Sequence, residues 1–336
     1  MPGVAIAILN YNGENHLKQF LPTLIANSKG CPIYIGDNAS VDDSVKLLKE
    51  YFPSTICVEL GDNFGYSGGY NRLIKHISEE FIILVNSDIE VTEAWIEPLI
   101  EEFKNDKVAA IQPKIKSYHK KEYFEYAGAA GGYIDKYGYP FCRGRLFNSI
   151  EKDTRQYDDA EYISWASGAC FAIRKSAFDQ VGGFDDDFFA HMEEIDLCWR
   201  LHTYGYSIRF TPESTVYHVG GGTLDYGSPF KTYLNYRNGL YLLLKNLPEK
   251  KRDQVIVVRV LLDWLSALLY LVRGKWEFSR AIMNAHKEVR KNRSNFLAKR
   301  INNIEDKGFR HNLSIVWEYF IKGKKEYRQL NSTRLN

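Results

Sequence analysis

Short apolar runs alternate with segments of helical spacing through the first part of the chain. The clearest run is Phe81–Val85, five consecutive apolar residues that lead directly into Asn86, Ser87 and Asp88. A continuous apolar run of this length is typical of a strand that is covered on both faces within an α/β sheet. Ligands of such sheets bind at the carboxyl ends of the strands, where Asn86 and Asp88 stand. Because side chains alternate along a strand, these two point to the same side and Ser87 points away.

The same alternation continues on both sides of this run. Strands are predicted at 4–9, 31–36, 56–60, 81–85 and 108–112. Apolar residues at helical spacing mark helices around 15–25, 45–51 and 94–103. This order predicts a doubly wound α/β domain, a mostly parallel sheet flanked by helices.

The pattern changes twice further along the chain. From 117 to about 162 it loosens into a segment rich in Gly and Tyr, which predicts an insertion over one end of the sheet. A helix around 191–200 and strands near 207–210 and 215–218 follow. Beyond Gly227 the pattern is helical to the end. We therefore place a boundary between a domain of residues 1–227 and a helical region of residues 228–336.

Composition narrows the class of protein. The 336 residues are 45% hydrophobic and 26% charged, which is typical of a folded globular chain. A net charge of +2 gives no general attraction to nucleic acid. Five scattered cysteines without a C-x-x-C pair argue against a disulfide framework or zinc site and indicate a reducing, cytoplasmic location. The apolar run behind Met1 lacks a preceding basic segment and predicts a strand, not a signal peptide.

Polar or glycine-rich clusters follow two other predicted strands. Asp37 and Asn38 can bind a nucleoside base or ribose through hydrogen bonds, with turn chemistry as the alternative. Glycines in segment 63–71 allow the backbone to approach a diphosphate closely. The spacing is not G-x-G-x-x-G, so an ordinary turn between strand and helix explains this segment equally well.

Asp88 and His218 together offer a carboxylate and an imidazole. With phosphate oxygens and water, these groups suit a divalent ion such as Mg²⁺ or Mn²⁺. A single histidine ahead of a glycine run is more often structural, and the sequence does not show that the two residues meet.

The predicted helix around 191–200 carries an acidic start. Glu193 and Glu194 point about 100° apart on a helix, so they cannot both face one point. Asp196 and Arg200 stand four residues apart and can pair, which would orient the helix. One glutamate is then left as a general base, with a solvated acidic face as the alternative.

Taken in order, these clusters resemble the inverting family-2 glycosyltransferases of GT-A fold, particularly their rhamnosyltransferase-like branch. The similarity covers roughly residues 4 to 225, with Tyr236-Arg237-Asn238 as an extension. Each segment is a weak signal alone, but seven in the correct order are strong. The segments are Asn10-Tyr11-Asn12, Asp37-Asn38-Ala39-Ser40, Asn63 to Asn71 with Gly65, Asn86-Ser87-Asp88, Ser167-Gly168-Ala169, Glu193 to Leu197 with Arg200, and His218.

The resemblance implies transfer of a sugar from a nucleotide-diphosphate donor to a hydroxyl of a glycan or lipid-linked acceptor in surface polysaccharide assembly. It hints at a dTDP-rhamnose donor, and UDP-hexose donors fit as well. Asp37 would contact the base or ribose, and Asn86 and Asp88 would correspond to the D-x-D element that holds metal and diphosphate. His218 would complete that site. The resemblance also places these residues on the donor side: Asn10, Asn38, Asn63, Gly65 and Asn71.

The acceptor side and the base follow from the same resemblance. Trp165, Ser167 and Gly168 would line the acceptor side, and Glu194 would be the base, with Glu193 as the alternative. Two departures matter. Asn86 replaces the first Asp of D-x-D and removes one charge. Glu194 replaces an Asp and lengthens the base by one methylene.

Two other functions compete with sugar transfer: nucleotidyl transfer, and binding or scaffolding without catalysis. A nucleotidyltransferase would carry a glycine-rich phosphate loop near the N-terminus, and residues 10–14 are not one. A catalytically inactive nucleotide-sugar-binding module or scaffold is the alternative, favoured by Asn86 and opposed by the retained Asp88, His218 and acidic helix start.

The apolar run 255–272 in the helical region carries one polar stripe. Its polar residues fall at i, i+4, i+7 and i+11, at Arg259, Asp263, Ser266 and Tyr270. A free transmembrane span would not normally carry Arg and Asp. The helix either docks on the catalytic domain or a homodimer partner, or lies in a membrane interface. Six Lys or Arg within 286–300 favour anionic lipid, and a solvated helical face explains them about equally well. Many enzymes of the resembled family act on lipid-linked acceptors, so the resemblance implies peripheral contact with the inner face of the cytoplasmic membrane.

Overall fold

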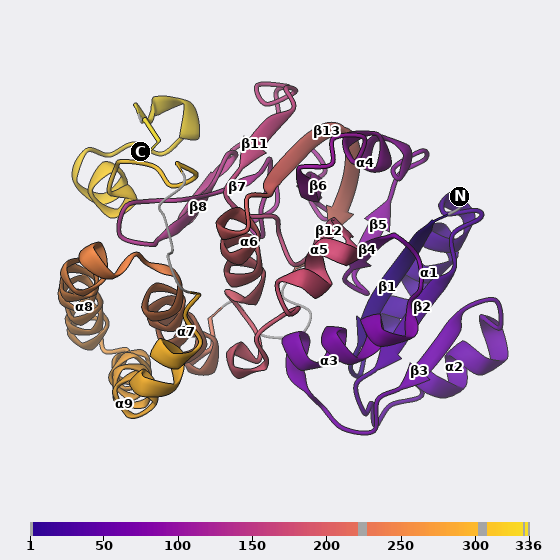
Figure 1. The fold of residues 1–336 in the computed structure, drawn as a ribbon, viewed down its shortest axis with the longest axis horizontal. Coiled ribbons are helices and arrows are strands. Elements are labelled where there is room, and N and C mark those ends of the chain that lie inside the picture. The colour runs from indigo at the N-terminus through magenta and orange to yellow at the C-terminus, as the bar shows by residue number, and fades with distance from the viewer. Residues whose placement is uncertain (1–2, 221–226, 302–307, 332, 335–336) are drawn as a thin grey trace.

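A computed structural model describes residues 3–220, 227–301, 308–331 and 333–334. At its centre the described chain forms one sheet of order β11-β13-β6-β12-β4-β1-β2-β3, with β5 paired to β13 (Figure 1). One half of the sheet is parallel and comprises β1 (Val4–Asn10), β2 (Ile33–Asp37), β3 (Ile56–Glu59) and β4 (Phe81–Val85). This half contains the runs that alternate most regularly with helices in the sequence.

The other half of the sheet mixes strand directions. It comprises β5 (Ile89–Val91), β6 (Val108–Ser117), β11 (Glu161–Ile163), β12 (Cys170–Arg174) and β13 (Ser207–His218). β12 runs antiparallel between β4 and β6, whereas β6 and β13 are parallel. The predicted α/β fold class is confirmed, with a mixed sheet. The two strands expected near 207–210 and 215–218 are one strand with a register shift between Thr211 and Thr215.

Helices cover both faces of the sheet. They are α1 (Glu14–Asn27), α2 (Ser44–Tyr51), α3 (Gly65–Leu73), α4 (Glu97–Glu102), α5 (Lys175–Gln180) and α6 (Glu193–Thr203), with short turns η1 (Ile74–His76) and η2 (Asp186–Phe188). Alternate residues of β1 join different cores: Ile6 packs with Leu17 of α1, and Ala7 packs with Leu73 of α3. Because side chains alternate along the strand, β1 contributes residues to the cores on both faces of the sheet.

α4 starts later than predicted because Ala94 has a positive φ of +51°, which a right-handed helix cannot contain, and the chain forms β5 just before this turn. Residues 89–91 pair antiparallel with the end of β13, with Ile89 opposite His218. This pairing brings the carboxyl end of β4 and the end of β13 together.

The segment expected as an insertion forms its own antiparallel sheet of β7 (Gly132–Ile134), β8 (Pro140–Cys142), β9 (Arg145–Leu146) and β10 (Ser149–Ile150). Trp165 packs directly on its first strand. A Cβ at Gly132 would lie only 2.2 Å from the Trp165 ring, so this contact requires glycine.

The helical region comprises α7 (Pro229–Asn246), α8 (Glu249–Val272) and α9 (Trp276–Ala298), followed by η3 (Trp317–Ile321) and η4 (Tyr327–Gln329). In Figure 1 the three long helices lie on the side of the molecule opposite β1–β3. Leu242 and Leu243 of α7 share a core with Ile195 and Leu197 of α6, so the core continues across the predicted boundary at residue 227.

Candidate active site

The polar residues at the ends of β1 and β2 form one hydrogen-bonded cluster. Asn10 Nδ2 donates to Asp37 Oδ1 (3.1 Å) and Ser40 Oγ (3.1 Å), and the Ser40 amide donates to Asp37 Oδ2 (3.0 Å). The strand register places Asn10 opposite Asp37. Asn10 Oδ1 is a buried acceptor without a partner among the described residues. The fold therefore brings two predicted donor-side residues together and leaves one acceptor atom unused.

A second cluster links Asn38 to the glycine-rich segment. Asn38 Nδ2 donates to Asn63 Oδ1 (2.9 Å) and to the Gly65 carbonyl (3.1 Å). Gly65 has a φ of +66°, and a Cβ there would lie 2.5 Å from the Phe189 ring. Glycine is therefore required where the start of α3 meets the loop before α6.

Asn71, the remaining donor-side residue of this segment, makes different contacts. Its Nδ2 donates to the Phe184 carbonyl (2.8 Å) and to Asp186 Oδ1 (2.6 Å), and its Oδ1 accepts from the Phe184 amide (2.9 Å). These bonds join α3 to the segment before α6, and contact with a donor stays a prediction.

Asp88 and His218 meet where β5 pairs with the end of β13. His218 Nε2 lies 3.2 Å from Asp88 Oδ1, and the other ring nitrogen, Nδ1, lies 3.2 Å from Glu125 Oε2. Burial alone would lower the pKa of His218, but hydrogen bonds to Asp88 and Glu125 outweigh burial and raise the pKa to about 10. At neutral pH the imidazole is therefore charged and lies between two carboxylates.

The Asp88–His218 pair fits one side of a divalent cation site once His218 releases the proton on Nε2, because only a neutral imidazole nitrogen can bind a metal. Neighbouring ligands of an octahedral Mg²⁺ lie about 3 Å apart, close to the 3.2 Å between Oδ1 and Nε2. Burial would raise the pKa of Asp88, but the bond to His218 lowers it, so the carboxylate is charged. Within the described ranges, no group of three or more His, Cys, Asp or Glu side chains could hold a metal ion. A cation here would therefore depend on further oxygens, such as phosphates and water.

The loop that ends at Ala169 connects this strand end to the start of α6. The backbone N–H of the half-buried Asn86 donates to the Ala169 carbonyl (2.9 Å). The Tyr66 hydroxyl donates to the Gly168 carbonyl (2.7 Å). A Cβ at Gly168 would lie 3.1 Å from Tyr66 Oη and 3.8 Å from Glu194 Cβ. Gly168 therefore lies beside Glu194, and its loop also contacts the Asn86–Asp88 strand end.

Trp165 and Ser167 use their polar atoms inside the protein. Trp165 Nε1 donates to the Tyr133 carbonyl (2.9 Å), and Ser167 Oγ donates to the Ala127 carbonyl (2.6 Å). Both side chains are buried. They hold the loop in shape, and their predicted contact with an acceptor stays a prediction.

Glu193 and Glu194 begin α6 with incompletely partnered carboxylates. One oxygen of each, Oε2, is buried without a hydrogen-bond partner among the described residues. Burial raises the pKa of Glu194 from 4.5 to about 7. Burial and repulsion from Glu194 raise the pKa of Glu193 well above its usual value, which favours the uncharged form of Glu193. Glu194 is half-buried whereas Glu193 is only 4% exposed, so Glu194 alone combines access with a pKa suited to a base.

The loop before these glutamates has an unusual backbone that α7 holds in place. Three of its residues other than glycine have positive φ: Phe189 (+63°), His191 (+69°) and Met192 (+72°). Such conformations are costly and persist only where the surrounding structure determines them. The buried Asn238 Nδ2 donates to the carbonyls of Phe188 (2.9 Å), Ala190 (2.9 Å) and His191 (2.7 Å). We call this set of bonds the Asn238 clamp.

The predicted pair of Asp196 and Arg200 is present, with Arg200 Nε 2.8 Å from Asp196 Oδ2. Lys245 Nζ (2.9 Å) and Asn246 Nδ2 (2.7 Å) of α7 also bind Asp196. Burial would raise the pKa of Asp196, but Arg200 and Lys245 lower it to about 2. The charged carboxylate thus joins α6 to α7, while the orienting role of the pair in catalysis stays a prediction.

Several residues around the site were not singled out by the sequence patterns. Glu125 lies in the insertion, Tyr66 lies in the glycine-rich segment, and Lys245 lies among leucines of α7. No motif or residue spacing in the sequence marks any of these three residues as part of the site. Asn238 had such a motif, because the segment Tyr236-Arg237-Asn238 was part of the resemblance.

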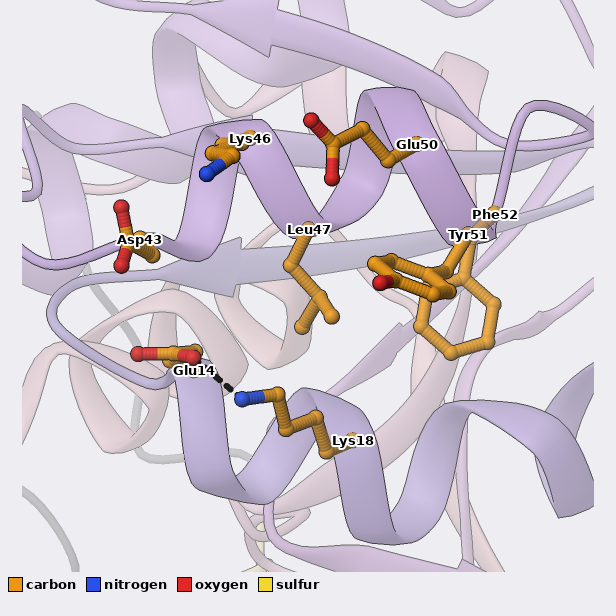
Figure 2. Close-up of a pocket in the computed structure, with 8 residues that line it drawn as sticks. All are labelled: Glu14, Lys18, Asp43, Lys46, Leu47, Glu50, Tyr51 and Phe52. Atoms are coloured by element: carbon orange, nitrogen blue, oxygen red, sulfur yellow. Dashed lines mark hydrogen bonds and ion pairs between the residues drawn. The ribbon is translucent and has the colours of Figure 1, made fainter.

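A pocket of about 430 Å³ between α1 and α2 is separate from this site. Figure 2 shows the Glu14–Lys18 ion pair on one side of it and α2 side chains on the other. It is lined by Glu14, Lys18, Asp43, Lys46, Leu47, Glu50, Tyr51 and Phe52. None of these is a predicted site residue.

The curled mixed sheet, with a carboxylate–imidazole pair at its strand ends and an acidic helix start nearby, defines the class of GT-A glycosyltransferases. Residues 5–182 match the model of Glycosyl transferase family 2, and the chain belongs to this family. The predicted family and enzyme class are therefore confirmed.

Relatives of known activity agree with this assignment. An N-acetylglucosaminyl-diphospho-decaprenol L-rhamnosyltransferase of Mycobacterium tuberculosis is 26% identical over 234 residues, covering 65% of this chain and 75% of the relative. The rhamnosyltransferase WbbL of Escherichia coli is 24% identical over 224 residues, covering 64% of this chain and 83% of the relative. A mannosyltransferase of Pyrobaculum calidifontis, solved with GDP-Man and Mn²⁺, has a TM-score of 0.52 at 13% identity and covers 89% of this chain and 79% of its own. The last similarity shows the fold.

Proposed function

We propose that this family-2 enzyme moves a sugar, with inversion, from a nucleotide-diphosphate donor to a hydroxyl of a glycan or lipid-linked acceptor. The observation that carries the proposal is the half-buried Glu194, with a pKa of about 7, beside the loop that contacts the Asn86–Asp88 strand end. A donor of dTDP-rhamnose or UDP-hexose type is favoured because relatives are named as rhamnosyltransferases and, in Haloferax volcanii, a hexosyltransferase.

The reaction needs one base and no protonating acid. Glu194 takes the proton of the acceptor hydroxyl, and the hydroxyl oxygen attacks the anomeric carbon from the face opposite the diphosphate. The bond between this carbon and the diphosphate oxygen breaks, and the nucleoside diphosphate leaves with the electron pair. Burial and the neighbouring Glu194 favour the uncharged form of Glu193, so Glu194 is the better base of the two.

The donor would lie along the strand ends. Asp37 and Asn38 would contact the nucleoside, and the unused Asn10 Oδ1 is an acceptor for a hydroxyl or amide. Asp88 and His218 would hold Mg²⁺ or Mn²⁺, which supplies positive charge against the leaving diphosphate when bound. Mn²⁺ in the P. calidifontis structure supports a divalent ion.

The acceptor is expected to be lipid-linked. The M. tuberculosis relative is named for a sugar carried on diphospho-decaprenol. A chain acting on such a substrate in surface polysaccharide assembly would work in the cytoplasm at the inner face of the cytoplasmic membrane.

The test is a thermal-shift screen of UDP, dTDP and GDP, with and without Mn²⁺ or Mg²⁺, followed by transfer with the matching nucleotide sugar. We expect one base to raise the melting temperature in a cation-dependent way, and Asp88→Asn to abolish the cation dependence. If no nucleotide shifted the melting temperature of well-folded protein, the scaffold alternative would replace this proposal, and a nucleotide-dependent shift without sugar transfer would instead favour the catalytically inactive binding module.

A further inference from the structure

α8 turns an entirely apolar face to solvent. Every exposed residue from 257 to 272 is apolar, and their exposure ranges from 48% at Leu269 to 79% at Val272. At 100° per residue these positions form one continuous stripe about four turns long. In Figure 1, α8 lies at the outer edge of the helical region, farthest from β1–β3. We call this surface the α8 face; it consists of Val257, Leu261, Trp264, Leu265, Leu268, Leu269, Leu271 and Val272.

The polar stripe of the same helix faces the protein. Arg259 Nε lies 3.1 Å from Asp263 Oδ1, and the Arg259 guanidinium lies over the Tyr139 ring at 3.7 Å. His286 Nε2 of α9 lies 3.2 Å from Asp263 Oδ2. These contacts fix the rotation of α8 from residue 257 onward, so its apolar residues point outward while Arg259 and Asp263 are buried.

By length and composition, α8 is the one helix of the described chain that could cross a membrane. Crossing would require separating the Arg259–Asp263 pair from Tyr139 and His286 and placing it against lipid. A charged pair is costly at the centre of a bilayer. The docked orientation instead suits a helix that lies flat, with one face in lipid and the other on the protein.

Basic residues continue directly from the α8 face. Residues 273–300 contain nine Lys or Arg and two Glu. Five of these cations on α9 are exposed: Arg280, Lys287, Arg290, Lys291 and Arg293. Trp276, which is 55% exposed, lies where α9 begins, and tryptophan is enriched at the boundary between lipid and water.

We propose that the α8 face inserts into the interface of an anionic lipid bilayer and that the basic residues of α9 bind its headgroups. Charge complementarity favours this occupant over a second copy of the chain. A second copy would offer the same excess of cations over carboxylates in residues 273–300 and so no matching negative surface for them, whereas an anionic bilayer offers one. A cytoplasmic leaflet offers both the apolar layer and the negative charge. The inference does not depend on the proposed sugar transfer.

The test is flotation of the full-length chain with vesicles of phosphatidylcholine alone or of phosphatidylcholine and phosphatidylglycerol at equal parts. We expect binding to the anionic vesicles and at least about tenfold weaker binding for Leu265→Ser combined with Leu268→Ser, which removes inserted apolar area. The matched control is Tyr51→Ser with Ile56→Ser, two exposed apolar residues at the other end of the molecule, which should bind like wild type.

Headgroup binding is tested separately by Lys287→Glu with Lys291→Glu. We expect severalfold weaker binding to anionic vesicles and weaker salt dependence. Lys29→Glu with Lys107→Glu makes the same charge change on exposed lysines of the sheet domain and should have little effect. Melting curves confirm that each variant is folded, and Leu261→Gln replaces the double serine variant if that one is not.

Two outcomes would overturn the proposal. One is wild-type protein that does not float with anionic vesicles, or floats equally well after the α8 face is made polar. The other is sedimentation equilibrium that shows a dimer for wild type and a monomer for the Leu265→Ser, Leu268→Ser variant, since a second copy would then cover the face.

Discussion

The two ends of the candidate site differ in how their polar groups are held. At the donor end, Asp37 accepts hydrogen bonds from Asn10 and Ser40, and the cluster is built from adjacent strand ends. At the catalytic end, Glu193 and Glu194 each keep a buried oxygen without a partner in the described chain, after a loop with strained backbone. The proposed donor end is held by contacts among its own strand ends, with Asn10 Oδ1 left unpartnered among the described residues, whereas the loop at the proposed catalytic end is also held by helix α7.

This difference has a chemical reason. A base must keep a free lone pair for the acceptor proton, so its environment cannot satisfy it fully. An unpaired buried carboxylate oxygen and a strained loop both cost folding free energy, which other contacts must offset. The Asn238 clamp and the Asp196–Lys245 contacts lie beside the two glutamates and can do so. Variants at the proposed catalytic end should therefore lower kcat, whereas variants at the proposed donor end should weaken donor binding.

The largest effect is expected for Glu194→Gln. The amide cannot accept the acceptor proton, so kcat should fall by about 10²–10⁴-fold. The nucleotide-induced rise in melting temperature should persist because the donor end is unchanged. Glu193→Gln is the matched control and should retain activity within severalfold, since burial already favours the uncharged form of Glu193. Reversed results would assign the base to Glu193.

A smaller but clear effect is expected for Asn238→Ala. The carbonyls of Ala190 and His191 would lose the Asn238 donor, while the Phe188 carbonyl would keep Arg237 Nη2 and the Ala190 amide, at a cost of about 1–3 kcal/mol in unfolding free energy. The loop would then sample other conformations, and kcat should fall by about tenfold or more while nucleotide binding is retained. Asn295→Ala, an exposed change on α9, is the control. Equal losses of kcat and nucleotide binding would show that the clamp supports the whole fold and not the catalytic end.

The pH dependence should report Glu194. With a pKa of about 7, the fraction of charged base rises about tenfold between pH 6 and pH 8, and kcat should rise with it. A pH profile of kcat that is flat over this range would contradict the assignment.

Stability should change in the opposite direction. The folded-state pKa of Glu194 lies above its usual 4.5, so its contribution to stability is complete below about pH 4.5 and is lost as pH rises through about 7. Glu194→Gln should therefore gain stability relative to wild type from pH 5 to pH 8, by about 1–2 kcal/mol after solvent screening. Melting curves at the two pH values measure the difference.

The smallest effect is expected at the donor end with Ser40→Ala. Ser40 Oγ accepts from Asn10 Nδ2 (3.1 Å) and from the Asn12 amide (2.9 Å). Its loss should cost about 1 kcal/mol of stability and raise KM for the donor severalfold, with kcat nearly unchanged. Ser78→Ala, an exposed change, is the control. A large loss of kcat would show that the two ends are coupled.

Local patterns in the sequence predicted much of the architecture. The apolar run Phe81–Val85 became the central β4, and the helical spacing after residue 14 became α1. The four-residue spacing of Asp196 and Arg200 became an ion pair. Each of these depends on residues within one or two turns or along one strand, where periodicity determines which side chains share a face.

Tertiary structure alone decided which distant residues meet. His218 reaches Asp88 because β5 pairs with the end of β13, and Glu125 reaches His218 from the insertion. Asn238 reaches the loop before Glu193 because α7 packs on α6. The stripe of Arg259 and Asp263 was visible in the sequence, but only packing against Tyr139 and His286 shows that it faces inward. Strand register and helix rotation are set by the packing of the whole core, which no local pattern encodes.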